Sequence, residues 1–381
     1  MQASTPCTLT RPHSGTIFVA IELSQRSWLV TLHSPDRDRI SRHKAEARDH
    51  EGLLRLIAQV RARAERKLGD VPEVVSCFEA GYDGFWLHHV LTAAGIRNFV
   101  FDPGSIAVEQ RPRRAKSDRI DGELLLRTLM AYRRGEPRVV RIVQVPSVEQ
   151  EDERRVSRER HRLVKERTSH INRIKALLRL KGLPAGNPKR HDYLKFVERQ
   201  RDWKGDPLSP HAFAEVAREH ARLMQVRDQI EALEKARPEP TSPAAAAMAQ
   251  RREQLRRAKG IGAAFATNLV NEALYKDFRN QRQVGAYFGL APSPWRSGSI
   301  EREQGISKAG NPRARETAIE MAWLWVQHQP GSALTRWFKE RTANASKRIR
   351  RIAIVALARK LVVALWRYLT TGLVPEGAVI A

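Results

Sequence analysis

The chain has 381 residues and a formal net charge of +26, with 68 Lys and Arg against 42 Asp and Glu. This length allows two or three domains, and a positive field of this size suits a polyanionic partner such as nucleic acid. Two cysteines, Cys7 and Cys77, are too few for a disulfide framework or a zinc site, and neither a signal peptide nor a lipidation motif is recognisable. We therefore expect a protein of the reducing cytoplasm. The most apolar run, 352–369, contains three cations, so we do not expect it to span a membrane.

The first part of the chain alternates strands and helices. Residues 15–23 and 27–35 predict two strands joined by a short turn, an opening hairpin. The pattern then predicts a helix over about 50–67, a strand at 73–80, a helix at 83–95 and a strand at 96–103. This alternation predicts an α/β domain with a partly parallel sheet.

Acidic residues stand in two of these predicted strands and on the next helix. Glu22 lies on the same face of its strand as Ala20, and Glu79 closes the apolar run VVSCF. Asp118 and Asp121, three residues apart at a helix start, share one face. Strand ends are where such sheets hold ligands, and burying an unpaired acid is costly, so we predict a metal or cation partner. Ordinary surface acids, or an edge-strand salt bridge for Glu22, are the alternative.

Cations crowd the segment that carries the two aspartates. Carboxylates hold hard divalent cations and arginines hold phosphates, so this combination is typical of metal-assisted phosphoryl chemistry on nucleic acid. The candidate metal is Mg²⁺, with Mn²⁺ as a second choice. The candidate nucleic-acid contacts in this segment are Arg113, Arg114 and Lys116.

The middle of the chain is charged and helical. Val164, Ile171 and Leu178 recur every seven residues, and Val216, Leu223 and Ile230 repeat the spacing after a turn-rich segment. This pattern predicts an antiparallel helical hairpin, either coiled-coil-like or part of an ordinary bundle. A Pro-rich stretch at 237–247 predicts a linker.

The last part, 248–375, predicts helices with a loop-rich middle. Gly260 and Gly262 precede a helix of small residues, a pattern typical of a helix-hairpin-helix turn that offers backbone N–H groups to phosphate. Ser297 lies in a predicted loop, WRSGSI, where a Ser-Gly pair is ordinarily just a turn. A helix at 313–328 and a basic segment, 347–360, complete this part.

Six segments in this order resemble a known family. The strand with Glu22, FEAGYDGFW, KSDRIDGELL, KGIGAAFATNLVNEAL, GLAPSPWRSGS and GISKAGNPRARE are similar to the insertion-sequence transposases called IS one-ten. The resemblance covers nearly the whole chain. It implies an RNase H-like, RuvC-type domain followed by a domain that bears a nucleophilic serine. It assigns a DEDD-type metal tetrad to Glu22, Glu79, Asp118 and Asp121, and the nucleophile to Ser297.

The resemblance also implies partners. Members of this family excise and insert their element through a circular intermediate, and at least some choose donor and target with an element-encoded RNA. We therefore expect double-stranded DNA and a guide RNA as partners, with Arg296, Lys308 and Arg313 as further phosphate contacts. We also expect a dimer or tetramer built on the central helices. The protein would act at the bacterial nucleoid and on no membrane.

Two features of the first strand depart from the family. Its usual Asp-x-Ser-Lys is Glu22-Leu23-Ser24-Gln25 here. The extra methylene of glutamate moves its oxygens by about 1 Å or more, and Mg²⁺ tolerates little distortion of its octahedron. Either the backbone compensates or this copy is weakened.

The predicted organisation is thus a RuvC-like domain at 14–147, a helical hairpin and linker at 148–247, and a mostly α-helical transposase domain at 248–375. The predicted function is DNA cleavage and rejoining through a phosphoserine link, with metal assistance. Two rivals stay open: a metal-only RuvC-like nuclease in which water attacks, and an inactive nucleic-acid-binding relic.

Overall fold

The computed structural model describes residues 15–106, 118–236, 242–297 and 300–380. Side chains at positions 38, 118, 119, 295–297 and 300–304 lie outside this description. The chain divides into two compact units, residues 1–145 and 146–381.

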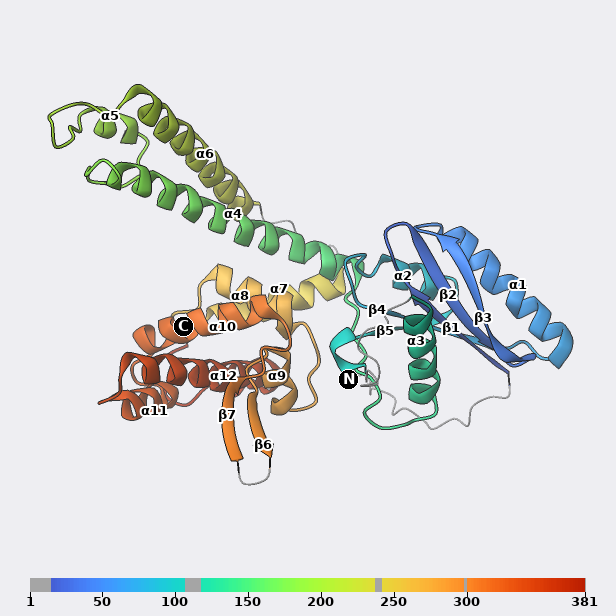
Figure 1. Cartoon of the computed structure of the whole chain (residues 1–381). Helices are drawn as coiled ribbons and strands as arrows, with labels where there is room; N and C mark the ends of the chain where they lie inside the picture. Colours follow the sequence, from blue (N-terminus) through green and yellow to red (C-terminus); the bar gives the residue numbers. More distant parts are fainter. Residues whose placement is uncertain (1–14, 107–117, 237–241, 298–299, 381) are drawn as a thin grey trace. The chain divides into compact units, whose positions relative to one another are not determined.

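A five-stranded mixed sheet forms the centre of the first unit (Figure 1). Its order is β3-β2-β1-β4-β5, with β1–β2 and β2–β3 antiparallel and β1–β4 and β4–β5 parallel. The predicted opening hairpin and partly parallel sheet, and with them the α/β class, are confirmed. The strands are β1 Thr16–Glu22, β2 Ser27–Ser34, β3 Arg37–Glu46, β4 Glu73–Glu79 and β5 Arg97–Phe101.

The strand β3 has no counterpart in the sequence prediction. Its sequence, RDRISRHKAE, carries charges through most of its length. It lies at the edge of the sheet, where charged side chains discourage pairing with other chains, and so it lacks the apolar alternation by which strands are recognised.

Helices cover both faces of this sheet. On one face, α1 (His50–Leu68) and α2 (Trp86–Ala93) pack through Leu53, Ile57 and Leu87 on the inward residues of the strands. On the other face, α3 (Asp118–Arg133) packs through Leu125, Leu126 and Leu129. A single 3₁₀ turn, Pro103–Ser105, follows β5.

The second unit begins with an antiparallel helical hairpin. It is formed by α4 (Val148–Arg179) and α6 (Pro210–Lys235), with the short helix α5 (Tyr193–Glu198) at its tip. Ile174 and Leu178, late in α4, pack on residues early in α6, and Leu163 packs on residues late in α6. The predicted hairpin is confirmed, and a capping box at Ser147 and Gln150 fixes where α4 starts.

The rest of the second unit is a helical domain with one small sheet, since β6 (Pro292–Ser297) and β7 (Ile300–Ile306) pair as an antiparallel hairpin. Its core joins α10 and α12 through residues such as Met321, Trp325 and Leu361. No helix in the described ranges is long and apolar enough to cross a membrane. The helices are α7 Pro243–Arg256, α8 Ala263–Leu269, the π-helical turn Val270–Leu274, α9 Gln281–Tyr287, α10 Pro312–His328, α11 Ala333–Thr342 and α12 Lys347–Thr371.

Candidate active site

Two acidic residues lie at the carboxyl ends of neighbouring parallel strands. β1 and β4 pair in register up to Ile21 and Phe78, and Glu22 and Glu79 are the next residues and the last of each strand. Adjacent strands lie about 4.8 Å apart, so the backbones at the two glutamates are close neighbours.

Both glutamates continue the rows of side chains that α3 covers. Ala20 and Cys77, two residues before them, are buried in a cluster with Leu125 of α3. Because strand side chains alternate between faces, positions 22 and 79 belong to the α3 face, as the sequence alternation predicts for Glu22. Burial raises the pKa of the Cys77 thiol, and so does the charge of Glu79, which agrees with a carboxylate near that thiol.

Helix α3 begins at this same edge of the sheet. Its last residue, Arg133, donates from Nη2 to Oε2 of Glu73, the first residue of β4, at 2.9 Å. Near its start, Gly122 lies close to Leu29, the cross-strand partner of Glu22, so the helix runs antiparallel to β4. Its 16 residues span about 24 Å and the seven residues of β4 about 23 Å, so the start of α3 reaches the strand's carboxyl end. Asp118 is the first residue of that helix, and Asp121 follows within its first turn.

Gly122 allows the start of α3 to approach the sheet closely. A Cβ atom at this position would lie 2.6 Å from Oγ1 of Thr31 and 3.3 Å from Cδ2 of Leu29. Leu29 is the cross-strand partner of Glu22. Asp121 directly precedes the glycine, and Asp118 lies one turn before it on the same helix face. The backbone thus carries all four acids to one edge of the sheet.

The residue types at this edge fit a hard divalent cation, because carboxylate oxygens are the ligands that Mg²⁺ and Mn²⁺ prefer. Among the described side chains, which do not include that of Asp118, no three His, Cys, Asp or Glu groups lie close enough to hold a metal ion. The fold therefore brings the four backbone positions to one edge of the sheet, but the described carboxylates are not close enough together to hold a metal ion.

Ser297 belongs to a strand and not to the loop that the sequence predicts. It is the last residue of β6, and its Cα partner across the hairpin is Ile300. The prediction was wrong because Pro292 and Pro294 mark a loop in the sequence, whereas an edge strand tolerates proline and the ladder here is irregular between them.

Only some of the predicted phosphate contacts lie in the described part of the chain. Arg113, Arg114 and Lys116 lie outside the described residues, as does the side chain of Arg296. Lys308 is exposed in the segment that joins β7 to α10, and Arg313 is exposed in the first turn of α10. Lys308 has φ of 55°, a left-handed conformation that is uncommon for lysine, so the backbone there is tightly constrained.

The turn at Gly260 and Gly262 joins α7 to α8 and is held by the domain core. Gly260 has φ of 92°, and a Cβ atom there would lie 2.8 Å from Cβ of His328. Lys259 donates its backbone N–H to Val379 and accepts from Nε2 of Gln329. Gly260 is therefore required for packing, and Gly262, which is exposed, keeps the prediction of a phosphate contact.

A buried carboxylate, Glu272, organises the base of the helical hairpin and was not predicted. Arg158 of α4 donates from Nε and Nη2 to its two oxygens at 2.8 and 3.1 Å, and Asn311 donates from Nδ2 at 2.9 Å. Burial raises the pKa of Glu272, but these hydrogen bonds and the charges of Arg158 and Arg154 together outweigh it and hold that pKa below its usual value. The apolar run around Glu272, together with Arg154 and Arg158 at i and i+4, is the signal that could have revealed it.

Asn311 connects Glu272 to the segment that follows the Ser297 hairpin. While its Nδ2 bonds Glu272, its Oδ1 accepts the backbone N–H groups of Arg313 and Ala314 and so caps α10. Beside this network, burial and the charge of Arg154 lower the pKa of Lys276 to about 8, and the Lys276 amine lies 4.4 Å from the ring centroid of Tyr287.

Comparisons with known proteins identify two parts of the chain. Residues 19–181, which contain all four acids, match the transposase family model DEDD_Tnp_IS110. Residues 252–359, which contain Ser297, match the model described as transposase IS116/IS110/IS902 family. Residues 182–251 lie in neither match.

Individual relatives agree with both models. The putative transposase y4rJ of Sinorhizobium fredii NGR234 is 47% identical over 98% of this chain and 96% of its own length. The transposase for insertion sequence element IS1111A of Coxiella burnetii is 30% identical over 61% of this chain and 62% of its own length. A probable family 20 transposase of Pseudomonas aeruginosa PAO1 is 30% identical over 61% of this chain.

Proposed function

This chain belongs to the IS116/IS110/IS902 family of transposases, and we propose that it breaks and rejoins DNA with Ser297 as nucleophile and a set of four carboxylates as metal ligands. As a transposase it is an enzyme that acts on DNA in the movement of an insertion sequence. The observation that supports the finer proposal is the convergence of Glu22, Glu79, Asp118 and Asp121 on one edge of the sheet.

In the proposed reaction Oγ of Ser297 attacks the phosphorus of a phosphodiester. The Oγ–P bond forms, the bond from phosphorus to the leaving sugar oxygen breaks, the serine loses its proton and the leaving oxygen gains one. A hydroxyl of the incoming strand then attacks the phosphoserine and releases the serine. The ester preserves the energy of the phosphodiester, so rejoining needs no ATP.

The four carboxylates would hold Mg²⁺ or Mn²⁺ near the reacting phosphate. A divalent cation held there would supply positive charge against the negative charge that develops on the phosphate and leaving oxygens. Positions 118 and 121 stand in the first turn of α3, where the helix dipole favours negative charge. Exposed Lys308 and Arg313 are the proposed phosphate contacts beside the Ser297 hairpin.

The acids and the serine come from different units of the chain, and the family resemblance implies that one subunit supplies its serine to the acids of another. We therefore propose a dimer or tetramer, with α4 and α6 as the assembling element and an element-encoded guide RNA that selects DNA sites. Double-stranded donor and target DNA are the substrates.

A metal-dependent nuclease in which water attacks is the second candidate, because the acidic edge alone could serve it. Asp121→Asn and Ser297→Ala separate the two in a strand-cleavage assay on DNA with element ends. We expect Asp121→Asn to lose cleavage by at least a hundredfold and to keep DNA binding, because one ligand is neutralised while the basic surface is untouched.

Ser297→Ala should lose cleavage to the same extent, whereas the matched Ser293→Ala, on the same strand, should retain it. Cleavage by Ser297→Ala at the wild-type rate, with Asp121→Asn inactive, would support the water-dependent nuclease. Full cleavage by Asp121→Asn in Mg²⁺ would exclude the acidic set.

A further inference from the structure

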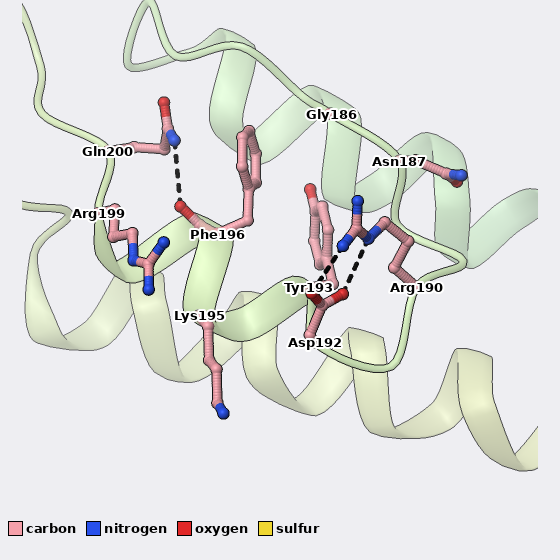
Figure 2. Close-up of a pocket in the computed structure, with 9 residues that line it drawn as sticks. All are labelled: Gly186, Asn187, Arg190, Asp192, Tyr193, Lys195, Phe196, Arg199 and Gln200. Carbon is pink, nitrogen blue, oxygen red and sulfur yellow. Dashed lines mark hydrogen bonds and ion pairs between the residues drawn. The ribbon is translucent and has the colours of Figure 1, made fainter.

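The tip of the helical hairpin carries a pocket that the proposed reaction does not use. It has a volume of about 380 Å³ and lies between the loop that follows α4 and the helix α5 (Figure 2). This falls within the range of about 300–1,000 Å³ that is usual for small-ligand sites. The pocket belongs to the part of the chain that matches neither family model.

Cations and an aromatic ring line this pocket together. Arg190, Lys195 and Arg199 contribute positive charge, and the ring of Phe196 lies between the two arginines in the view of Figure 2. Arg190 is paired with Asp192 at 2.7 Å, whereas within the described part of the chain neither Lys195 nor Arg199 belongs to an ion pair. Two exposed cations therefore remain for an anionic ligand.

The aromatic floor of the pocket is held in place. The Phe196 ring stacks on Tyr193 at 5.8 Å, and Tyr193 stacks on His220 of α6 at 5.4 Å. The Tyr193 hydroxyl donates to the carbonyl of Ala185 at 2.7 Å, which ties the loop to α5. Gly186 packs on Phe196 so closely that a Cβ atom would lie 2.7 Å from its Cε1. The pocket thus exists before any ligand arrives.

The surroundings repeat the same chemistry. Residues 180–209 hold seven Lys and Arg against four Asp and Glu. Trp203 is 83% exposed, and the Lys204 amine lies 4.9 Å from its ring centroid. Trp203 is thus an exposed aromatic ring among cations, while Phe196 of the pocket is half-buried. Aromatic rings among cations are typical of surfaces on which unpaired bases stack while the backbone is neutralised. A paired duplex hides the faces of its bases, so a strand that uses such rings must be single-stranded.

We propose that this tip pocket binds an unpaired nucleotide of a nucleic-acid strand, with the base against Phe196 and the phosphates at Lys195 and Arg199. The pocket shares no residue with the acidic edge or with the Ser297 hairpin. It would give the helical hairpin a role in holding a single-stranded segment, which neither family match assigns to it.

Binding of full-length protein to unstructured 12-nucleotide RNA and DNA strands tests this, because it requires no cleavage and is independent of Ser297. The variant Lys195→Ala/Arg199→Ala should bind roughly tenfold more weakly or worse, and its salt dependence should be shallower by about 1.4 in log–log slope. The matched control Arg162→Ala/Arg167→Ala removes the same charge from one exposed and one half-buried position on α4 and should bind as the wild type does.

A 5-iodouracil strand, irradiated on the protein, reports the location directly. We expect its crosslink within residues 186–203. Whichever strand, RNA or DNA, binds more tightly and crosslinks more efficiently identifies the kind of nucleic acid that the pocket prefers. Phe196→Tyr should keep the crosslink because it keeps the ring. Crosslinks confined to other segments, together with equal binding by pocket and control variants, would overturn the proposal. So would pocket variants that change only the oligomeric state, since the pocket would then be a protein interface.

Discussion

Glu22 is the residue whose chemistry departs most from the set that the family resemblance implies. It ends β1 beside Glu79, so its backbone stands where an aspartate would be expected to reach a cation. Its longer side chain must either fold back or hold the cation further from the sheet. The two alternatives would differ in how well they suit Mg²⁺, a small ion that requires near-ideal octahedral geometry.

We predict that Glu22→Asp raises the rate of strand cleavage in Mg²⁺ severalfold and narrows the advantage of Mn²⁺ over Mg²⁺. The shorter side chain restores the ligand reach that Mg²⁺ requires, whereas Mn²⁺ tolerates distortion better. Cleavage rates measured with each metal, for the variant and the wild type, check this. Activity lost with both metals would mean that the backbone is adapted to glutamate.

At the scale of elements, the contact between α3 and the sheet positions two of the four acids. Gly122 lies close to the sheet, next to the buried Thr31. Within the described residues Oγ1 of Thr31 has no hydrogen-bond partner, so no bond constrains its replacement. Substitution at Gly122 can therefore push α3 away from the sheet, and substitution of Thr31 can let it return.

Gly122→Ala should reduce cleavage at least tenfold, because its Cβ would meet Thr31 Oγ1 at 2.6 Å and push the start of α3, with Asp118 and Asp121, away from the sheet. Adding Thr31→Ala removes that atom and should restore most of the activity. Circular dichroism of both variants serves as the control for folding. If the double variant stays as inactive as Gly122→Ala, the spacing of α3 is not what limits the reaction.

The network at the base of the hairpin makes a prediction about pH. The folded protein holds the Lys276 amine at a pKa of about 8, below its ordinary value of 10.5. Between about pH 8 and 10 the unfolded chain therefore binds more protons at this group than the folded chain, and stability should rise with pH.

We expect this group to contribute about 1–2 kcal/mol over that range, after allowance for the partial exposure of the amine. Urea unfolding of wild type and Lys276→Met at pH 7.5 and pH 9.5 measures the contribution. The wild type should gain stability relative to the variant as pH rises. A constant difference would mean that Lys276 titrates normally.

The elements that the sequence predicted share one property, a strong apolar period. The buried strands β1, β2 and β4 and the seven-residue spacing of α4 and α6 are examples. The two strands that were missed have charged residues or prolines at positions where a strand ordinarily shows apolar residues. The strand β3 carries charges through most of its length, and β6 contains two prolines, so both become strands through pairing with a neighbouring strand. Local pattern carries no information about such pairing.

In the candidate site, too, local sequence patterns predicted some features and missed others. Strand ends and helix faces predicted that Glu22, Glu79, Asp118 and Asp121 belong together, because these periods are local. No pattern predicted the close approach at Gly122 or the bonds from Arg158 and Asn311 to Glu272, because they join segments far apart in the sequence. Ser297 was singled out by the family resemblance and not by its neighbours.

At the scale of the whole molecule, the acids lie in the first unit, residues 1–145, and Ser297 lies in the second, residues 146–381. The proposed chemistry needs a carboxylate set and a nucleophile at one phosphate, so it depends on bringing the two units together within or between subunits. The formal net charge of +26 supplies the attraction that gathers both on DNA.

The most direct measurement of the central claim is the trapping of a covalent intermediate. A nicked suicide substrate, from which the leaving strand diffuses away, should leave wild-type protein joined to DNA through an adduct that survives denaturant. Mass spectrometry of the digested adduct should place the phosphate on Ser297, and Ser293→Ala should form the same adduct. Efficient cleavage with no adduct, or an adduct on another residue, would contradict the account.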